Sequence, residues 1–546
     1  MRAGRKLSGL LALGVVGAMA LTGAFGAGSA MAEEPGEQCA GANPTEGQGS
    51  SLQKTAQEIW GAGFNTSANG SACNGTQGSK AKPVVKYSST GSGAGKTVWG
   101  AEKAGNKPKD GKKENPAESG DVFVGSDEPL TPAQMKNVDE AAGGTEQTLV
   151  VPVEQAAVAV IVNPPAECLI TKITNANLQA IWNGTITEWS GVTGGKAEGA
   201  GVTEDTAGAC KSAIKRIARL DSSGTTFVFK SYLFEILKTA TCSGKTWAEY
   251  AAPAENTNWP EEPAGTCKGK VTHAAKSGGG GEAEEVEKTS GSIGYANLAD
   301  ARAKFTDETG DHYHWVGVQN QIEAGFYPNP GTSTGEPSLT TGESNCKGTH
   351  YGELPKVGAD DDWSKVSGAH TKLNANYPIC TLTYDVALMN YTLAVYSKPA
   401  EEAKAVYDYI NYAVAPGGGQ TDLAGHDYHE VEEAVGKFAQ EEALLIAEGS
   451  DVAVEASTFD LVENLSLLTF GAEKVLDIIF QMKAGLKWAP ALRLSPGGEG
   501  KKFDIITDLC TGHTFVPIES CLIEIEKLTA GLEFVFDGNR NILHIE

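Results

Sequence analysis

The stretch that decides the fold reads IKRIARL-DSSGT-TFVFKSYL, from Ile214 to Leu233. Residues 214–220 predict a β-strand, which ends at the small-residue turn 221–225. The apolar and aromatic residues that follow have the composition of a helix. A strand, a turn and a helix in this order are the unit of α/β proteins, whose ligands bind at the carboxyl ends of the strands. We therefore expect an α/β fold with a binding site at this turn.

Similar turns follow other strand-like runs, at 84–87 and 121–124, and a long β-branched run covers 150–162. Four turns rich in Gly, Ser or Thr stand out, at 49–52, 90–93, 125–127 and 222–225. A helix that begins at such a turn has free backbone N–H groups and a partial positive charge, so it can bind an anion without a basic side chain. Each turn alone is typical of a helix N-cap. Several turns that converge with an arginine would form an anion site.

The charge balance excludes two classes of partner. The 546 residues include 44 basic and 69 acidic side chains, a net charge of −25. Proteins that bind nucleic acid or anionic membrane surfaces do so through an excess of Lys and Arg, so neither partner is expected. The length predicts several folding units, and 40% hydrophobic residues suffice for buried cores.

The N-terminus predicts export. A basic head (Arg2, Arg5, Lys6) precedes an apolar run to Phe25 and the small-x-small sequence 30–32. This is the layout of a signal peptide, so we expect cleavage near Ala32 and removal of residues 1–32. The alternative is a membrane anchor, but a run rich in Gly and Ala that acidic sequence follows at once favours cleavage. Loss of three basic residues takes the charge from −25 to −28. No Cys follows the run directly, so we expect a secreted or extracytoplasmic protein without a lipid anchor.

Cysteines in an exported chain predict disulfides. None of them forms a CxxC pair, which disfavours a zinc or redox site. Ten is an even number, so we expect five bridges, and pairing in chain order would close short loops. The sequence does not determine the connectivity of Cys39, Cys73, Cys168, Cys210, Cys242, Cys267, Cys346, Cys380, Cys510 and Cys521.

Two other sequence patterns do not predict a cofactor site or a metal site. The run GSGAGKT at 91–97 is not a P-loop, because Thr90 stands where that motif needs its first Gly. The His residues at 312 and 314 and at 426 and 429 lack Cys or carboxylate neighbours at a metal-binding spacing, so we expect surface residues. No cofactor is therefore expected.

The run KSGGGGE at 276–282 fits either a flexible linker or a tight loop inside a domain.

Five stretches, in this order, resemble the phosphate-binding protein of bacterial ABC phosphate importers. They are GQGSSL (47–52), VKYSSTGSGAG (85–95), VFVGSDEPL (122–130), IARLDSSGTTFVF (217–229) and GSIGYA (291–296). The fourth is the most specific, and the resemblance covers about residues 40 to 450. It implies a two-lobed, periplasmic-binding-protein-like α/β clamp of type II. Lobe I would comprise 33–150 and 379–450, and lobe II 151–378.

The resemblance also implies which residues hold phosphate between the lobes. They are Ser51, the backbone of Leu52, Ser92, Asp127, Arg219, Ser223, Gly224 and Thr225. Their chemistry agrees, because a guanidinium fork suits an oxyanion, hydroxyls are neutral donors and Gly allows close approach. Asp221 could orient Arg219. The family commonly shows Thr-Phe where this chain has Ser51-Leu52, which leaves the shape of the cleft wall open.

Asp127 is expected to set selectivity. Phosphate at neutral pH still carries a proton that it can donate to a carboxylate, whereas sulfate carries none. An unpaired buried carboxylate beside an anion costs several kcal/mol, so selectivities on the order of 10⁴–10⁵ are within reach.

The sequence therefore predicts an exported monomer that captures inorganic phosphate and delivers it to an ABC permease, without enzymatic activity. One alternative is a secreted phosphatase on the same clamp, which would need a metal cluster or an activated nucleophile. Another is a phosphate-sensing or cell-surface attachment protein whose C-terminal part carries the function.

Residues 451–546 lie beyond the resemblance. The apolar run 461–486 contains several charges and is no membrane span. Residues 515–526 and 532–545 predict strands, the second broken by the hairpin signal Asp537-Gly538. We expect a small α+β appendage here.

Overall fold

The computed structural model describes residues 45–446, together with 534–536 and 542–545. Gaps within the first range fall at 65–84, 102–120, 143–146, 195–199, 240, 253–255, 262–266, 306–314, 322–324, 332–343, 347–348, 350, 359–360, 367–375 and 392–398. The predicted signal peptide, four of the ten cysteines and the first His pair lie outside the described residues. Those expectations stay predictions.

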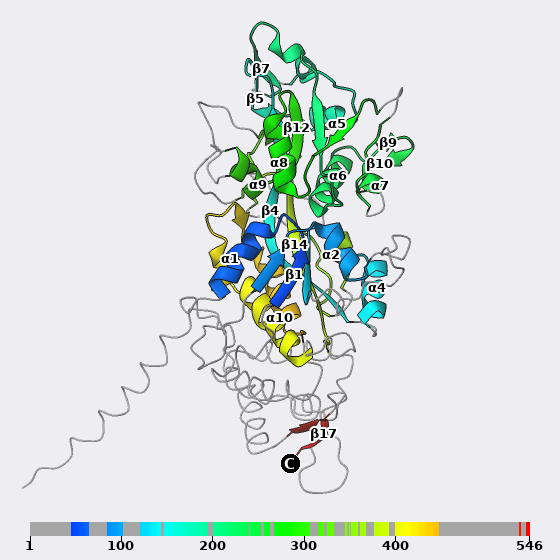
Figure 1. Cartoon of the computed structure of the whole chain (residues 1–546), viewed down its shortest axis with the longest axis vertical. Coiled ribbons are helices and arrows are strands. Elements are labelled where there is room, and N and C mark those ends of the chain that lie inside the picture. Colours follow the sequence, from blue (N-terminus) through cyan, green and yellow to red (C-terminus); the bar gives the residue numbers. More distant parts are fainter. Residues whose placement is uncertain are drawn as a thin grey trace, which may run out of the picture.

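The described chain is an α/β protein with two lobes, one above the other in Figure 1. A nine-stranded sheet runs through both lobes in the order β11-β8-β12-β4-β14-β3-β1-β2, and β15 pairs with β4 beside this path. Its strands are β1 (Thr45–Gly49), β2 (Val85–Ser88), β3 (Phe123–Ser126), β4 (Thr148–Asn163), β8 (Lys215–Ala218), β11 (Val271–His273), β12 (Ser292–Asn297), β14 (Cys380–Leu388) and β15 (Tyr428–His429).

The two ends of the sheet repeat one arrangement. In the lower lobe, β1 lies between β2 and β3 and is parallel to both, and β3 is antiparallel to β14. In the upper lobe, β8 lies between β11 and β12 and is parallel to both, and β12 is antiparallel to β4. The expected two-lobed α/β architecture is therefore confirmed.

Strand β4 joins the lobes. Its first part, from Thr148 to Ala157, pairs with β14, and its second part, from Val158 to Asn163, pairs with β12. All of β4 but its last residue is buried, because helices of both lobes pack against it. The predicted lobe boundary at residue 150 falls inside this strand, and the division into 33–150, 151–378 and 379–450 stays a prediction.

Helices cover the sheet in both lobes (Figure 1). The helices of the lower lobe are α1 (Lys54–Phe64), α2 (Ser92–Val98), α4 (Pro132–Ala142), α10 (Pro399–Val414), α11 (Gly419–Asp422) and α12 (Glu433–Ala443). Those of the upper lobe are α5 (Asn175–Trp182), α6 (Gly224–Ile236), α7 (Trp247–Ala251), α8 (Gly279–Lys288) and α9 (Leu298–Lys304). Among the described helices, none combines the length and apolar character needed to cross a bilayer.

Short elements complete the structure. The short strands are β5 (Cys168–Ile170), β6 (Lys172–Ile173), β7 (Val202–Asp205), β9 (Thr241–Cys242), β10 (Lys245–Thr246), β13 (Gly317–Val318), β16 (Phe534–Phe536) and β17 (Ile542–Ile545). The 3₁₀ turns are η2 (Trp189–Gly191), η4 (Ala209–Lys211) and η6 (Trp363–Lys365). Strands β16 and β17 pair antiparallel, which confirms the expected hairpin in the C-terminal part, and the predicted turn at 537–538 lies outside the described residues. The rest of the predicted appendage is not described.

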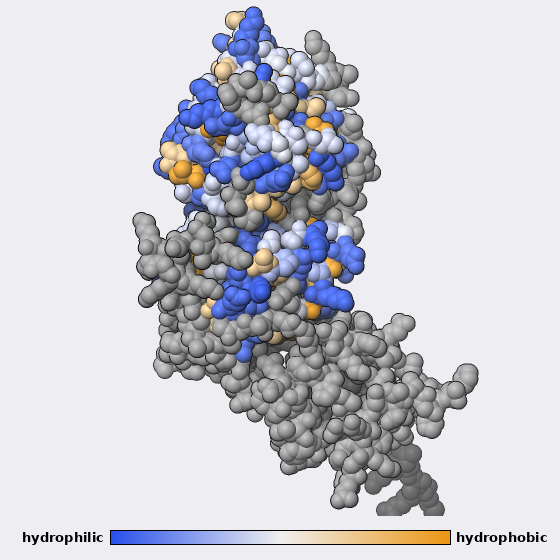
Figure 2. Space-filling model, turned by 90° about the vertical axis from the view of Figure 1, so that its right-hand side faces the viewer, coloured by the Kyte–Doolittle hydropathy of each residue, from blue (hydrophilic) through white to orange (hydrophobic). Residues whose placement is uncertain are grey.

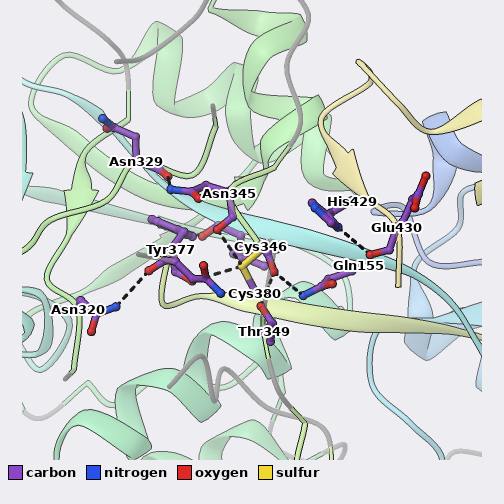
Figure 3. The surroundings of a disulfide bond; sticks show 12 residues. Gln155, Asn320, Asn329, Asn345, Cys346, Thr349, Tyr377, Cys380, His429 and Glu430 are labelled. Carbon is purple, nitrogen blue, oxygen red and sulfur yellow. Dashed lines mark hydrogen bonds between the residues drawn. A yellow bond between two sulfur atoms is a disulfide. The ribbon is translucent and has the colours of Figure 1, made fainter. Parts of the chain in front are cut away.

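Three disulfides lie in the described part of the chain, and each joins cysteines that are neighbours in sequence order. The bridges are Cys168–Cys210, Cys242–Cys267 and Cys346–Cys380. Figure 3 shows the last one at the start of β14, where Gln155 of β4 donates to the carbonyl of Cys346 (3.0 Å). The disulfide prediction is confirmed for these six cysteines, and the other two bridges stay predictions.

The described surface shows how polar and apolar residues are distributed and where the second His pair lies. On the face drawn in Figure 2, apolar residues occur in small separate spots among hydrophilic ones. His426 is exposed and His429 is half-buried, so the second predicted surface pair is only partly at the surface.

The run 276–282 is not a linker, because helix α8 begins within it and packs against β12.

Candidate functional site

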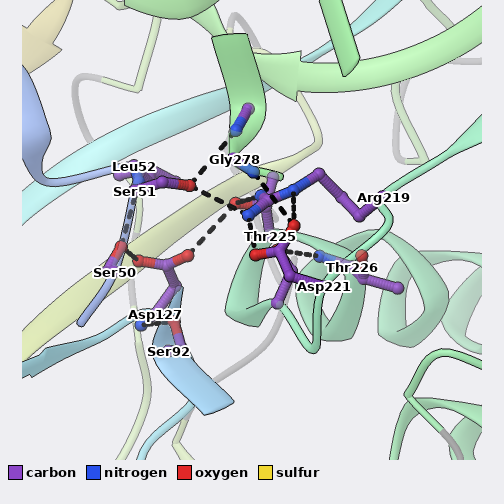
Figure 4. A network of polar contacts seen from close by, with 12 residues as sticks. Ser50, Ser51, Leu52, Ser92, Asp127, Arg219, Asp221, Thr225, Thr226 and Gly278 are labelled. Carbon is purple, nitrogen blue, oxygen red and sulfur yellow. Dashed lines mark hydrogen bonds and ion pairs between the residues drawn. The ribbon is translucent and has the colours of Figure 1, made fainter. Parts of the chain in front are cut away.

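The predicted site residues gather where the two lobes meet. Figure 4 shows the turn after β1 and Asp127 on one side, with Arg219 and the start of α6 on the other. Each turn follows the carboxyl end of a parallel strand or begins a helix, where backbone N–H groups have no helical partner. The side chains of both lobes are in direct contact, so the site is an enclosed polar cluster.

The turn after β1 contributes three consecutive residues. Gly49 adopts φ 139° and lies so close to the carbonyl of Gly125 that a Cβ would sit 2.1 Å from that oxygen, so only Gly fits. Ser50 follows, and its Oγ accepts the N–H of Leu52 (3.0 Å) and that of Gln53 (3.3 Å). These bonds form the turn that leads into α1.

Ser51 links the lower lobe to the upper one. Its Oγ accepts a hydrogen bond from Arg219 Nη2 (3.0 Å) and another from the backbone N–H of Gly279 (3.2 Å). A hydroxyl has two acceptor lone pairs and one proton. Because both lone pairs are occupied, the proton of Ser51 is directed toward a further acceptor.

Asp127 follows β3 and is 1% exposed. Ser50 Oγ donates to its Oδ1, and Thr225 Oγ1 donates to its Oδ2 across the lobes (3.1 Å). Its backbone N–H donates to Ser92 Oγ (3.2 Å), which leaves the Ser92 proton for another acceptor. Burial raises the pKa of Asp127, against the opposing effects of the Ser50 and Thr225 hydroxyls and the charge of Arg219.

Arg219 follows β8 and provides the positive charge of the cluster. Its Nε donates to Asp221 Oδ1 (3.0 Å) and its Nη2 donates to Asp221 Oδ2, so Asp221 orients the guanidinium as expected. Its Nη1 lies 3.5 Å from Thr225 Oγ1. Burial alone would lower the pKa of Arg219, but the charge and hydrogen bonds of Asp221, together with the charges of Glu282 and Tyr295, raise it. The side chain is therefore a fixed cation.

The start of α6 is held from outside the cluster. Ser223 caps the helix, and its Oγ accepts the N–H of Thr226 (3.3 Å). Asn256 fixes the cap, because its Oδ1 accepts the N–H of Ser223 (2.8 Å) and its Nδ2 donates to the Ser223 carbonyl (2.9 Å). At Gly224 a Cβ would lie 2.6 Å from the Cβ of Asp127, so Gly is required for the lobes to approach this closely.

Carboxyl groups also surround the cluster. Glu128 forms an ion pair with Lys96 (2.7 Å), and both side chains are buried. Burial raises the pKa of Asp300 to about 6 and that of Glu282 well above its ordinary value. Within the described residues, no group of three or more His, Cys, Asp or Glu side chains is placed to hold a metal ion.

The structure brings together the eight predicted site residues, and all eight are buried. One detail differs from the expectation, because the backbone N–H of Leu52 donates to Ser50 Oγ in this structure. Whether the eight residues bind phosphate stays a prediction.

Sequence reasoning missed Ser50, Gly278 and Gly279. Ser50 Oγ contacts Asp127, and the N–H of Gly278 donates to Asp221 Oδ1 (3.0 Å). The predicted turn at 49–52 already contained Ser50, whereas the two glycines gave no signal of a helix start, because Gly is favoured after the end of a helix and only modestly at its N-cap.

Comparison with known proteins places this geometry in a family. The family model described as a PBP superfamily domain matches residues 42–341, more than half of the chain. No curated protein matches.

Three similar solved structures have low identity. A human phosphate binding apolipoprotein is 18% identical with a TM-score of 0.46, over 72% of this chain and 92% of that one. A phosphate-binding protein from Stenotrophomonas maltophilia is 15% identical with a TM-score of 0.45, over 73% and 93%. A putative phosphate ABC transporter substrate-binding protein from Clostridium perfringens, with bound phosphate, is 12% identical with a TM-score of 0.38, over 71% and 100%. The family match, together with two lobes that share one strand order, shows that this chain belongs to the PBP (periplasmic binding protein) superfamily.

Proposed function

We propose that this protein is an exported solute-binding protein that captures inorganic phosphate between its lobes and delivers it to an ABC permease, without catalysing a reaction. The observation that carries the proposal is the enclosed cluster of donors from both lobes around Arg219 and Asp127. Ser51, Ser92 and Thr225 supply hydroxyls, and Arg219 supplies a fixed charge. We propose that the protein works as a monomer outside the cytoplasm.

Donor geometry supports an anionic ligand. The hydroxyl oxygens of Ser51 and Ser92 already accept hydrogen bonds from N–H groups. Their protons therefore point elsewhere and can be donated to a ligand. The N-terminus of α6 adds free N–H groups and a partial positive charge. An oxyanion is the ligand that satisfies many donors at once, and a guanidinium binds it more strongly than a neutral donor does.

Asp127 supports phosphate over other oxyanions. It is buried among these donors and would face the ligand with an acceptor oxygen. A phosphate that keeps one proton can donate to that oxygen, whereas sulfate would leave a buried carboxylate against its own negative charge. The net charge of −25 does not oppose binding, because distant charges are screened beyond about 8 Å at physiological salt.

A thermal-shift titration tests the proposal. The full chain, stripped of ligand by partial unfolding and dialysis, is titrated with phosphate, sulfate and a phosphate monoester. We expect phosphate to stabilise the protein by about 2.7 kcal/mol at hundredfold excess over Kd. Sulfate should do so only at far higher concentration. No shift with millimolar phosphate would refute the proposal, and release of phosphate from the ester would favour the phosphatase alternative.

A further inference from the structure

Ser50 lies in the cluster but is not one of the eight residues that we expect to contact the anion. Its side chain is fully buried at the end of β1. Its Oγ accepts the N–H of Leu52 and the N–H of Gln53, at 3.0 and 3.3 Å. Because a hydroxyl has only two acceptor lone pairs, its single proton is directed to its remaining neighbour, which is Asp127 Oδ1.

The two carboxylate oxygens of Asp127 therefore have different roles. Oδ1 is held by Ser50 within the lower lobe, whereas Oδ2 faces the upper lobe and meets Thr225 Oγ1 at 3.1 Å. Figure 4 shows Asp127 between Ser50 on one side and Thr225 on the other. A ligand between the lobes would meet Oδ2, the oxygen that Ser50 leaves uncovered.

We propose that Ser50 is a positioning residue that keeps Asp127 ionised, with Oδ2 turned to the ligand, and thereby sets the pH range over which the site distinguishes phosphate from sulfate. The inference rests on the proposed function, since it concerns how that same site selects its ligand. A donor with no alternative acceptor stabilises the charged carboxylate over the neutral acid. A protonated Asp127 could donate to sulfate, so its protonation would remove the barrier against that ion.

The electrostatic surroundings make this donor necessary. Burial raises the pKa of Asp127, and the hydroxyl of Ser50 is the largest of the effects that oppose burial. The charged and titratable groups that interact electrostatically with Asp127 are Lys96 of α2, Arg219 after β8, Glu154 of β4, Asp300 of α9 and Tyr87 of β2. Glu128, the next residue in the chain, is paired with Lys96. The hydroxyl of Tyr87 donates to the backbone carbonyl of Ser50 (2.9 Å), so a change of the Ser50 side chain leaves this hydrogen bond in place.

The competing explanation is that Ser50 only caps the turn into α1. A cap needs the two accepted N–H bonds and nothing from Asp127. The two explanations differ in one measurable respect, because a lost cap lowers stability at every pH, whereas a lost donor to Asp127 changes selectivity only where that carboxyl titrates.

The experiment measures the ratio of phosphate to sulfate affinity from pH 5 to pH 9, by competitive titration of the full chain. It compares wild type, Ser50→Ala, Asp127→Asn and the double variant. A hydrogen bond to a charged group corresponds to about one to two pKa units, so the loss of selectivity in Ser50→Ala should begin about one pH unit higher than in wild type. At pH 9 the two ratios should agree. In the Asp127→Asn background, Ser50→Ala should leave the ratio unchanged at every pH.

A matched control comes from Thr174, which caps α5 by accepting the N–H of Asn177 (3.1 Å) away from the cluster. Thr174→Ala should lower stability and leave the pH profile of the ratio unchanged. If Ser50→Ala does not fold, Ser50→Cys keeps the size with a weaker donor and should shift the profile in the same direction.

Two results would overturn the inference while the proposed function stands. One is a wild type that selects phosphate and an alanine variant with the same pH profile. The other is a change of the ratio by Ser50→Ala that persists in the Asp127→Asn background. A wild type that binds no phosphate would instead refute the proposed function itself, and with it this inference.

Discussion

Replacement of Arg219 by Ala removes the central cation of the candidate site. The guanidinium makes hydrogen bonds with Asp221 and Ser51 and lies 3.5 Å from Thr225 Oγ1. Its side chain is 1% exposed, so solvent screens its charge only weakly. Asp221 is 14% exposed and keeps the N–H of Gly278 (3.0 Å), so the variant should still fold.

The loss of affinity follows from this geometry. Truncating one member of a buried charge pair costs about 2–5 kcal/mol, because the other charge is left without its partner. For a desolvated anion this corresponds to a rise of Kd by about 30-fold to several thousand-fold. The larger end is expected here, since the guanidinium is fixed by Asp221 before the ligand arrives.

Isothermal titration calorimetry with phosphate measures the effect on the full chain. A matched control is Arg216→Ala on β8, the strand that Arg219 follows, because Arg216 is also buried but donates to the carbonyls of Trp182 (2.8 Å) and Lys268 (2.8 Å). The control should lower stability and leave Kd nearly unchanged. A loss of less than about tenfold in Arg219→Ala would mean that Arg219 does not contact the ligand, and the assignment of the site would be wrong.

Three further outcomes are expected. Asp127→Asn should keep phosphate affinity within a modest factor and raise sulfate affinity by roughly 2–3 kcal/mol, and an unchanged ratio in competitive titration would remove this residue from the site. Gly224→Ala should weaken phosphate binding in calorimetry with little loss of melting temperature, because the new Cβ would lie 2.8 Å from the N of Glu128 and hold the lobes apart; wild-type affinity would contradict this closed geometry. Burial raises the pKa of Asp385 to about 7, against a hydrogen bond from Gln57. The folded state therefore holds the proton of Asp385 more tightly than the unfolded state, so this proton's contribution to the free energy of unfolding is fully present below about pH 4 and is lost as the pH rises through 7. Urea unfolding should therefore show a smaller decline from pH 5 to pH 8 in Asp385→Asn than in wild type, and equal declines would show that Asp385 does not titrate in this range.

Much of the local structure could be predicted from residue patterns. The run 214–233 predicts a strand, a turn and a helix, and the structure has β8 and α6 in these places. The run 150–162 falls inside β4, because a strand buried on both faces has apolar residues throughout. The glycines at 278–281 misled the prediction, since a helix that begins without a side-chain cap looks like a loop in sequence.

The site residues were predicted from the family resemblance, and so was the orientation of Arg219 by Asp221, but the different contacts of Ser50 and Ser51 were not. The sequence places Ser50 beside Ser51, but nothing in the order of residues shows that one hydroxyl contacts Asp127 and the other contacts Arg219. That difference depends on the turn at Gly49, which directs successive side chains to different neighbours.

Strand–turn–helix order and the disulfide pairing of the six described cysteines were within reach of the amino-acid sequence, because they follow from local composition and from cysteines that are neighbours in sequence order. The contacts that close the cluster are not local. Ser51 and Arg219 are 168 residues apart, and Asp127 and Thr225 are 98 apart, yet both pairs lie within hydrogen-bonding distance. They meet because β4 crosses from one lobe to the other, which directs the carboxyl ends of two separate sets of parallel strands toward each other. Only the folded chain reveals this meeting, because it arises from the packing of one lobe against the other and leaves no periodic pattern in the residues that take part.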